Sequence, residues 1–141
     1  MTGRLQSLYD DFDLLDEWED RYRYVIELGK QLPPFDEQYR NAAHKVSGCA
    51  SQVWIYSQVE RRDGNTIVTY SGESDALIVK GLIAIAFIIF SGRTPKEILA
   101  QDAGEVFARL GLREHLTQQR SNGLASMVKR IKSDALVAAS A

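Results

Sequence analysis

This chain is organised around one stretch of sequence, Val46-Ser47-Gly48-Cys49-Ala50-Ser51-Gln52-Val53-Trp54. Cys49 is the only cysteine among the 141 residues, and small residues flank it on both sides. Glycine adopts backbone angles that other residues resist, so Gly48 predicts a tight turn just before the thiol. A β-rich run begins near Gln52, which places Cys49 at the tip of a loop on a stiff scaffold. Chemistry is often carried on such loops, and Cys49 is therefore a candidate reactive group.

The alternative for Cys49 is an inert place in the core. A lone cysteine is more often a small buried apolar side chain than a reactive one. Its neighbours Ser47, Gly48 and Ser51 are poor core residues, whereas a structural cysteine is more at home among leucines and valines. These neighbours favour the reactive interpretation and leave the inert one open.

A β-hairpin is predicted directly behind the cysteine stretch. Residues 52–60 show a β pattern with large side chains on both faces, and residues 66–70 are rich in β-branched side chains. The Asp63-Gly64 pair between them favours a tight turn, so we expect the two strands to pair antiparallel. Residues 44–46 predict a short strand that enters the cysteine loop, which makes a sheet of about three strands.

Helical patterns lie on both sides of this hairpin. Before it, we expect one helix within residues 1–15 and a second that Asp16 caps and the Pro33-Pro34 pair stops. After it, Ser74 is predicted to cap a central core helix that is apolar on most sides. Asp75 then lies in the first turn, where an acid suits the positive end of a helix.

Shorter helices are predicted in the last third of the chain. The run Thr94-Pro95-Lys96-Glu97 carries a helix start signal, namely a cap, a proline in the first turn and a closing glutamate. A break near residues 102–104 divides the next segment, and Gly111 fits a helix stop. A last amphipathic helix covers residues 124–131, and residues 135–141 are predicted to form a frayed tail. This order of elements predicts an α+β fold in one domain over residues 1–141.

Composition and charge exclude several classes of function. The hydrophobic share of 45% and charged share of 26% are those of an ordinary globular domain. A net charge of −2 provides no basic field, so nucleic acid is not an expected partner. One cysteine cannot form an internal disulfide, and no apolar run follows the first residues, so we expect a cytoplasmic protein without a secretory signal. The uncharged run 81–90 is about half the length of a membrane span.

Cys49, His44 and His115 are the chain's only cysteine and histidines. They are too few for a structural zinc site or an iron–sulfur cluster, so no metal is expected. A cysteine hydrolase needs a base beside the thiol, for which His44 and His115 are the candidates, although neither lies in a hydrolase motif. Sulfur acceptance needs one thiolate, which attacks the outer sulfur of a persulfide as in thiol–disulfide exchange. A third alternative is an interaction module with an inert Cys49.

Four segments in order along the chain resemble the SufE family, the sulfur-acceptor partners of cysteine desulfurases. They are YVIELGKQLP at 24–33, SGCASQVW at 47–54, GESDALIVKGL at 72–82, and HLT with RSNGL within 115–124. The resemblance spans roughly residues 18–131. It implies the fold of the IscU/NifU scaffold proteins, a small antiparallel sheet with helices on one face.

The resemblance also implies a function. It implies that a SufS- or CsdA-type cysteine desulfurase transfers sulfur to Cys49, which then carries it as a persulfide. This transfer stimulates the desulfurase. The sulfur then passes to an iron–sulfur scaffold such as SufBCD. The chain is then a sulfur-transfer partner rather than a stand-alone enzyme. It needs no cofactor of its own, since the pyridoxal phosphate belongs to the desulfurase. The resemblance does not decide between the SufE and CsdE subtypes. It also leaves open the downstream recipient of the sulfur and whether the chain forms a homodimer.

Roles follow for the matched residues. Cys49 takes the acceptor role. Arg120 matches the arginine of an Arg-Ser-x-Gly segment, which resembles the part of the family that lies near the cysteine loop. Arg120 is expected to steady a persulfide anion or to contact the desulfurase, with a solvated helix-start residue as the alternative. Ser51 and Gln52 are expected to brace the loop, and Asp75 is either a supporting residue or only a helix acid.

The thiolate and the persulfide set two further requirements. Little of a free cysteine is ionised at neutral pH, so loop N–H groups or the cations Lys45, His44 and Arg120 are expected to help the anion. A persulfide is easily reduced, which predicts a covered position beside an apolar pocket. We expect Gly48 to supply the mobility that exposes it when a partner docks.

Overall fold

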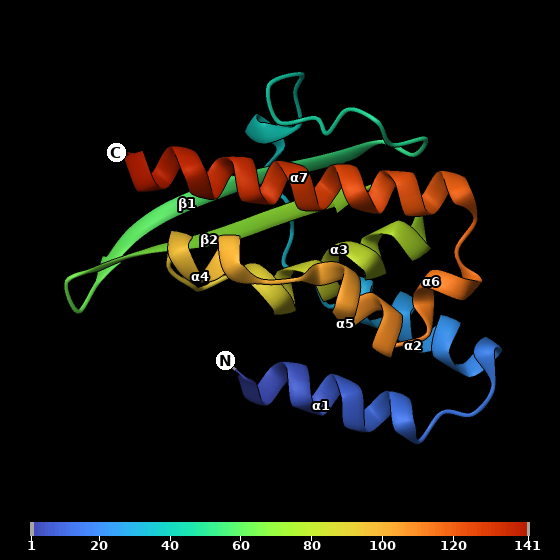
Figure 1. Cartoon of the computed structure of the whole chain (residues 1–141). Helices are drawn as coiled ribbons and strands as arrows, with labels where there is room; N and C mark the ends of the chain where they lie inside the picture. The colour runs from blue at the N-terminus through green and yellow to red at the C-terminus, as the bar shows by residue number, and fades with distance from the viewer. Residues whose placement is uncertain (1, 141) are drawn as a thin grey trace.

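The computed structural model describes residues 2–140 and runs from helices through one hairpin to further helices (Figure 1). The predicted α+β class is confirmed. The elements are α1 Thr2–Asp13, α2 Trp18–Lys30, the 3-10 turn η1 Glu37–Tyr39, β1 Val53–Arg62, β2 Asn65–Ser74, α3 Leu77–Phe90, α4 Pro95–Ala100, α5 Ala103–Arg109, α6 Leu112–His115 and α7 Gln118–Ser140.

The hairpin forms where the Asp-Gly pair predicted it. β1 and β2 pair antiparallel along their whole length, from Val53 opposite Ser74 to Arg62 opposite Asn65. Asp63 and Gly64 at the turn both have positive φ, 52° and 80°, which is the geometry whose twist matches paired strands. β2 is longer than the β-branched run suggested, because its polar second half continues in register with β1.

The sheet of the described residues has two strands, where about three were predicted. Residues 44–46 form only an isolated bridge, in which Lys45 lies opposite Trp54. Val46 N donates to Val53 O at 2.8 Å, and Ile55 N donates to His44 O at 2.9 Å. The chain then turns at Gly48, which has a φ of 88°, and leaves the sheet. The Ser-Gly turn follows too soon after Val46 for a strand to extend.

One face of the hairpin carries the core. Tyr70 of β2 stacks on Phe87 of α3, with ring centroids 5.9 Å apart, and donates its hydroxyl to Ile131 O of α7 at 2.8 Å. Helices α3 and α7 therefore cover the same face, as Figure 1 also shows for α7 across the strands. On the opposite face, Trp54 is 8% exposed because Arg40 covers its ring at 4.9 Å.

Helices α2 and α3 cross with their backbones in contact. A Cβ placed on Gly81 lies 2.1 Å from the carbonyl oxygen of Val25, and one on Gly29 lies 2.5 Å from Gly81 N. No side chain larger than hydrogen fits at either position without moving a helix. This contact brings α3 into the centre of the molecule, where 12 of its 14 residues are buried.

Two predicted helix starts are wrong and one is confirmed. α2 begins at Trp18 after Glu17, without a side-chain cap, so Asp16 does not form the expected capping box. Ser74 ends β2 instead of capping α3, and its hydroxyl accepts a hydrogen bond from Ala76 N at 3.2 Å. The box at Thr94 forms with both of its hydrogen bonds. Pairing with β1 keeps Ser74 in the strand, which moves the helix start to Leu77.

The C-terminal segment is helical rather than frayed. α7 continues to Ser140, and Ala135 and Ala138 are buried at 0% and 6% exposure. Small side chains let this end of α7 approach the core closely, which holds the last turns in place. Ala141, also part of the predicted tail, lies outside the described residues. Within residues 2–140, no helix has both the length and the apolar character that a membrane crossing requires.

Candidate functional site

The cysteine loop, residues 47–51, lies on the surface of α7. A Cβ on Gly48 falls 2.4 Å from Ser126 Oγ, so the positive φ of Gly48 and its lack of a side chain are both needed here. Cys49 lies over Gly123, with 3.4 Å between Sγ and the Gly123 carbonyl oxygen. Gly123 and Ser126 are one turn apart on α7, so two small residues form the seat of the loop.

The far end of the loop is held by Asp75. Its carboxylate accepts a hydrogen bond from Gln52 N at 3.0 Å, and its own N donates to Gln52 O at 3.4 Å. Asp75 precedes α3 instead of lying in its first turn, so it is a loop brace and not a helix acid. Gln52 takes part through its backbone. The predicted bracing by Ser51 is not seen, because its side chain makes no hydrogen bond within residues 2–140.

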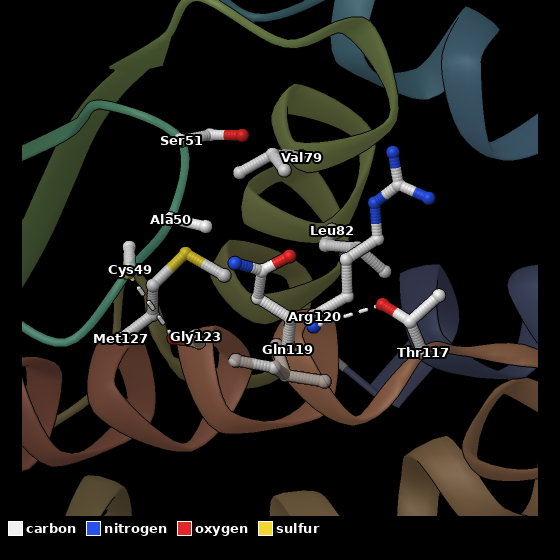
Figure 2. A pocket seen from close by; sticks show the side chains of 11 residues that line it. Cys49, Ala50, Ser51, Val79, Leu82, Thr117, Gln119, Arg120, Gly123 and Met127 are labelled. Atoms are coloured by element: carbon white, nitrogen blue, oxygen red, sulfur yellow. Dashed lines mark hydrogen bonds between the residues drawn. The ribbon is translucent and has the colours of Figure 1, made fainter.

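A pocket opens beside Cys49, where an apolar pocket was predicted, and its lining is apolar only in part. It is a cavity of about 240 Å³ between the loop, α3 and the first turns of α7 (Figure 2). The α3 side is apolar, and the start of α7 adds polar side chains. Its lining residues are Cys49, Ala50, Ser51, Val79, Leu82, Thr117, Gln119, Arg120, Gly123, Leu124 and Met127.

The surroundings of the Cys49 thiol favour its neutral form. The side chain is half-buried, and loss of solvation raises the pKa of the Cys49 thiol above its ordinary value. The thiol donates to the carbonyl of Gly123, a contact that also favours the protonated state. Within residues 2–140, no cation donates a hydrogen bond to Sγ, so the expected help from Lys45, His44 or Arg120 is not present in this conformation.

Arg120 lies in the same pocket as Cys49 but does not point at it. Its backbone N donates to Thr117 Oγ1 at 3.2 Å, which fixes the first turn of α7. Its guanidinium extends away from Cys49 to the opposite end of the pocket (Figure 2). The structure therefore brings the two residues together without a contact between their functional groups.

The two histidines are engaged elsewhere. His44 bonds through Nδ1 to Asn41 Oδ1 at 2.9 Å and lies edge-on to Tyr56. His115 stacks on Trp18, with ring centroids 4.2 Å apart. Neither lines the pocket at Cys49, so a thiol–imidazole pair for hydrolysis is not assembled.

Apart from Arg120, the residues of α7 are the part of the site that sequence reasoning missed. Gly123 and Ser126 seat the loop, and Gln119 and Met127 line the pocket. Small residues at a spacing of three on an amphipathic helix were the available signal. That pattern does not show which segment lies on them. Within residues 2–140, no three His, Cys, Asp or Glu side chains come together as a set of metal ligands.

Comparisons with known proteins give a consistent result. The profile of the SufE family, described as an Fe-S metabolism associated domain, matches residues 6–135. An uncharacterized SufE-like protein of Rhizobium meliloti is 54% identical over 131 residues, which are 93% of this chain and 94% of that protein. Another from Rhizobium etli is 53% identical over 137 residues, covering 97% and 93% of the two chains.

A solved structure shares the fold. The solution structure of a hypothetical protein from Thermus thermophilus matches with a TM-score of 0.76, over 97% of this chain and 96% of that one. Its sequence identity is 20%, so the match concerns the arrangement of the elements alone.

Proposed function

Because the chain belongs to the SufE family, we propose that Cys49 accepts sulfane sulfur from a cysteine desulfurase and carries it as a persulfide. The observation that carries this proposal is a lone, half-buried thiol at the tip of a loop, beside a pocket. Neither histidine of the chain lines that pocket. Such a site suits a group that stores a reactive atom. The desulfurase supplies the pyridoxal phosphate, and this chain needs none.

The transfer step is a thiol–persulfide exchange. The Cys49 thiolate attacks the outer sulfur of the desulfurase persulfide, a sulfur–sulfur bond forms on Cys49, and the bond on the desulfurase breaks. The desulfurase cysteine leaves as a thiolate, so no net oxidation occurs. The Cys49 thiol must lose its proton before the attack. This proton ends on the departing thiolate or in solvent.

The resting conformation supports a role for the partner in starting this step. Burial and the Gly123 carbonyl both keep Cys49 protonated. Docking that lifts the loop from α7 removes both effects, because the thiol then meets water and the groups of the desulfurase. In this way clearance of the desulfurase persulfide, and thus faster turnover, depends on the protein–protein contact.

Arg120 is proposed to contact the desulfurase. Its side chain is exposed, and its guanidinium points away from the resting thiol. A planar guanidinium recognises carboxylates well, which suits a surface contact. After loading, the sulfur passes to an iron–sulfur scaffold of the SufBCD type, in keeping with the family's description as associated with Fe-S metabolism.

The proposal is tested by weighing the intact protein after incubation with a cysteine desulfurase and cysteine. We expect a gain of one or more sulfur atoms that a reductant removes, and a faster desulfurase turnover. Cys49→Ser is the matched control, since it leaves no thiol in the chain. No gain in wild-type protein, with an active desulfurase, supports the inert module instead. Hydrolysis of a thioester or amide without any desulfurase supports the hydrolase.

A further inference from the structure

Sulfur loading changes the hydrogen bonding of the Cys49 side chain. The free thiol donates its proton to the carbonyl oxygen of Gly123, 3.4 Å from Sγ. In the persulfide, Sγ is bonded to the outer sulfur and has no proton, so this hydrogen bond is lost. An anionic outer sulfur is also repelled by a carbonyl oxygen. It therefore needs hydrogen-bond donors on another side.

The side-chain donors of the pocket are Ser51 on the loop and three residues at the start of α7, namely Thr117, Gln119 and Arg120. Val79 and Leu82 of α3 have none. The Arg120 guanidinium extends away from Cys49 (Figure 2). The Gln119 amide instead turns back into the pocket, towards the side where Cys49 and Met127 lie (Figure 2).

The Gln119 amide is also without a hydrogen-bond partner within residues 2–140. Its neighbour Gln118 donates from Nε2 to Asn122 Oδ1 at 2.9 Å, whereas within residues 2–140 the Gln119 amide has no such partner. A primary amide has two N–H donors and no charge. We propose that Gln119 Nε2 donates to the outer sulfur of the Cys49 persulfide inside the pocket, an inference that rests on the proposed function.

A neutral donor suits a sulfur that must later be released. A hydrogen bond to the anion keeps the persulfide ionised. The negative charge of the persulfide then repels an attacking thiolate. Reduction by small thiols is slowed in this way. A guanidinium in the same place binds the anion more strongly, which also slows its transfer to the next acceptor. The direction of Arg120 away from Cys49 is consistent with this division between the two side chains.

The test compares Gln119→Leu and Gln119→Glu with Gln118→Leu as the matched control. Gln118 is the adjacent residue, is also exposed, and lines a different cavity between α5, α6 and α7. Each protein is loaded in two ways, with inorganic polysulfide and with a desulfurase plus cysteine. Loss of sulfur to glutathione at fixed pH is then followed by intact mass.

We expect Gln119→Leu to lose sulfur about fivefold faster than wild type, the effect of removing one hydrogen bond to an anion at an exposed position. Gln119→Glu should lose it faster still, because its carboxylate repels the anion. Gln118→Leu should match wild type. Equal rates for Gln119→Leu and wild type, or an equally fast Gln118→Leu, overturn the inference.

A second readout separates binding from a general loosening of the site. The pH dependence of alkylation is measured for the loaded and the sulfur-free protein. Gln119→Leu should raise the pKa of the persulfide and leave the pKa of the thiol unchanged, since the thiol faces Gly123. Equal shifts in both overturn the inference. If wild type accepts sulfur from polysulfide but not from a desulfurase, the proposed function fails, and the polysulfide-loaded proteins still decide the role of Gln119.

Discussion

Helix α3 and the cysteine loop form two walls of one pocket, yet they are held in different ways. In α3, 12 of 14 residues are buried, and apolar contacts on most sides hold the helix. In residues 47–51 no residue is buried, and contacts at Gly48, Cys49 and Gln52 hold the loop. A segment with few buried contacts opens at low free energy. We therefore expect the thiol to leave its pocket while the α3 wall stays in place.

The largest effect is expected on the α3 side of this comparison, from Gly81→Ala. The new Cβ lies 2.1 Å from the Val25 carbonyl oxygen, and a backbone atom in a packed helix cannot move aside alone. We expect the free energy of unfolding to fall by about 3 kcal/mol, measured by urea unfolding.

Gly3→Ala is the control for Gly81→Ala. Gly3 lies in α1 with nothing within 4 Å of an added Cβ, so this change should be neutral or stabilise by about 0.5–1 kcal/mol. Similar losses for both variants contradict the account of the α2–α3 contact.

On the loop side, Gly48→Val should slow sulfur transfer without unfolding the protein. The left-handed φ of 88° is strained for valine by about 1–2 kcal/mol. The new side chain also meets Ser126 Oγ. Transfer is measured by intact mass over time with a desulfurase, and folding by circular dichroism.

Adding Ser126→Gly to Gly48→Val sharpens this result. The double variant removes the contact with α7 and keeps the strained φ. Recovery of transfer assigns the defect to the seat on α7, and a persistent defect assigns it to the backbone. Unchanged transfer in the single variant rejects the hinge role of Gly48.

A smaller effect is expected from the brace at the end of the loop. Asp75→Ala removes the acceptor for Gln52 N, so Cys49 should be alkylated faster at neutral pH, with a loss of stability of about 0.5–1 kcal/mol. Asp75→Asn retains a carbonyl oxygen at the same place and should lie between Ala and wild type. Alkylation rates that do not differ among the three show that Asp75 does not restrain the loop.

The smallest effect concerns the pH dependence of the resting thiol. Burial raises the pKa of Cys49, so the midpoint of its alkylation profile should lie above that of the chain unfolded in guanidinium. A raised pKa means that the folded state binds the proton more tightly. The resulting stabilisation is fully present below the unfolded pKa and is lost as pH rises through the folded pKa.

Cys49→Ser should abolish that alkaline loss of stability, which unfolding at a series of pH values measures. A native midpoint at or below the unfolded one shows instead that the site stabilises the thiolate at rest.

Local sequence rules succeeded where neighbouring residues decide the structure. The Asp63-Gly64 turn and the Thr94 capping box each depend on contacts within a few residues, and both formed as predicted. The apolar run in α3 also predicted its burial, because an element that is apolar on most sides must be covered.

The same rules failed where a distant segment competes for the same residues. Ser74 is a good cap by type, but pairing with Val53 keeps it in β2. Asp75 has the signature of a helix acid, and instead binds Gln52 across 23 positions of sequence. Residues 135–140 have a weak pattern of small side chains, which suits close packing on a core that the sequence does not display.

The sequence by itself determined that one cysteine lies on a Gly-containing loop ahead of a hairpin, and that α3 belongs inside. Local backbone preference and apolar patterning are enough for those conclusions. Only the tertiary structure decided that Gly123 and Ser126 lie under the loop, that burial raises the pKa of the Cys49 thiol, and that Gln119 rather than Arg120 turns towards Cys49. These properties depend on desolvation and on contacts about 70 residues apart in the chain, such as that between Cys49 and Gly123, and neither is encoded in residue type.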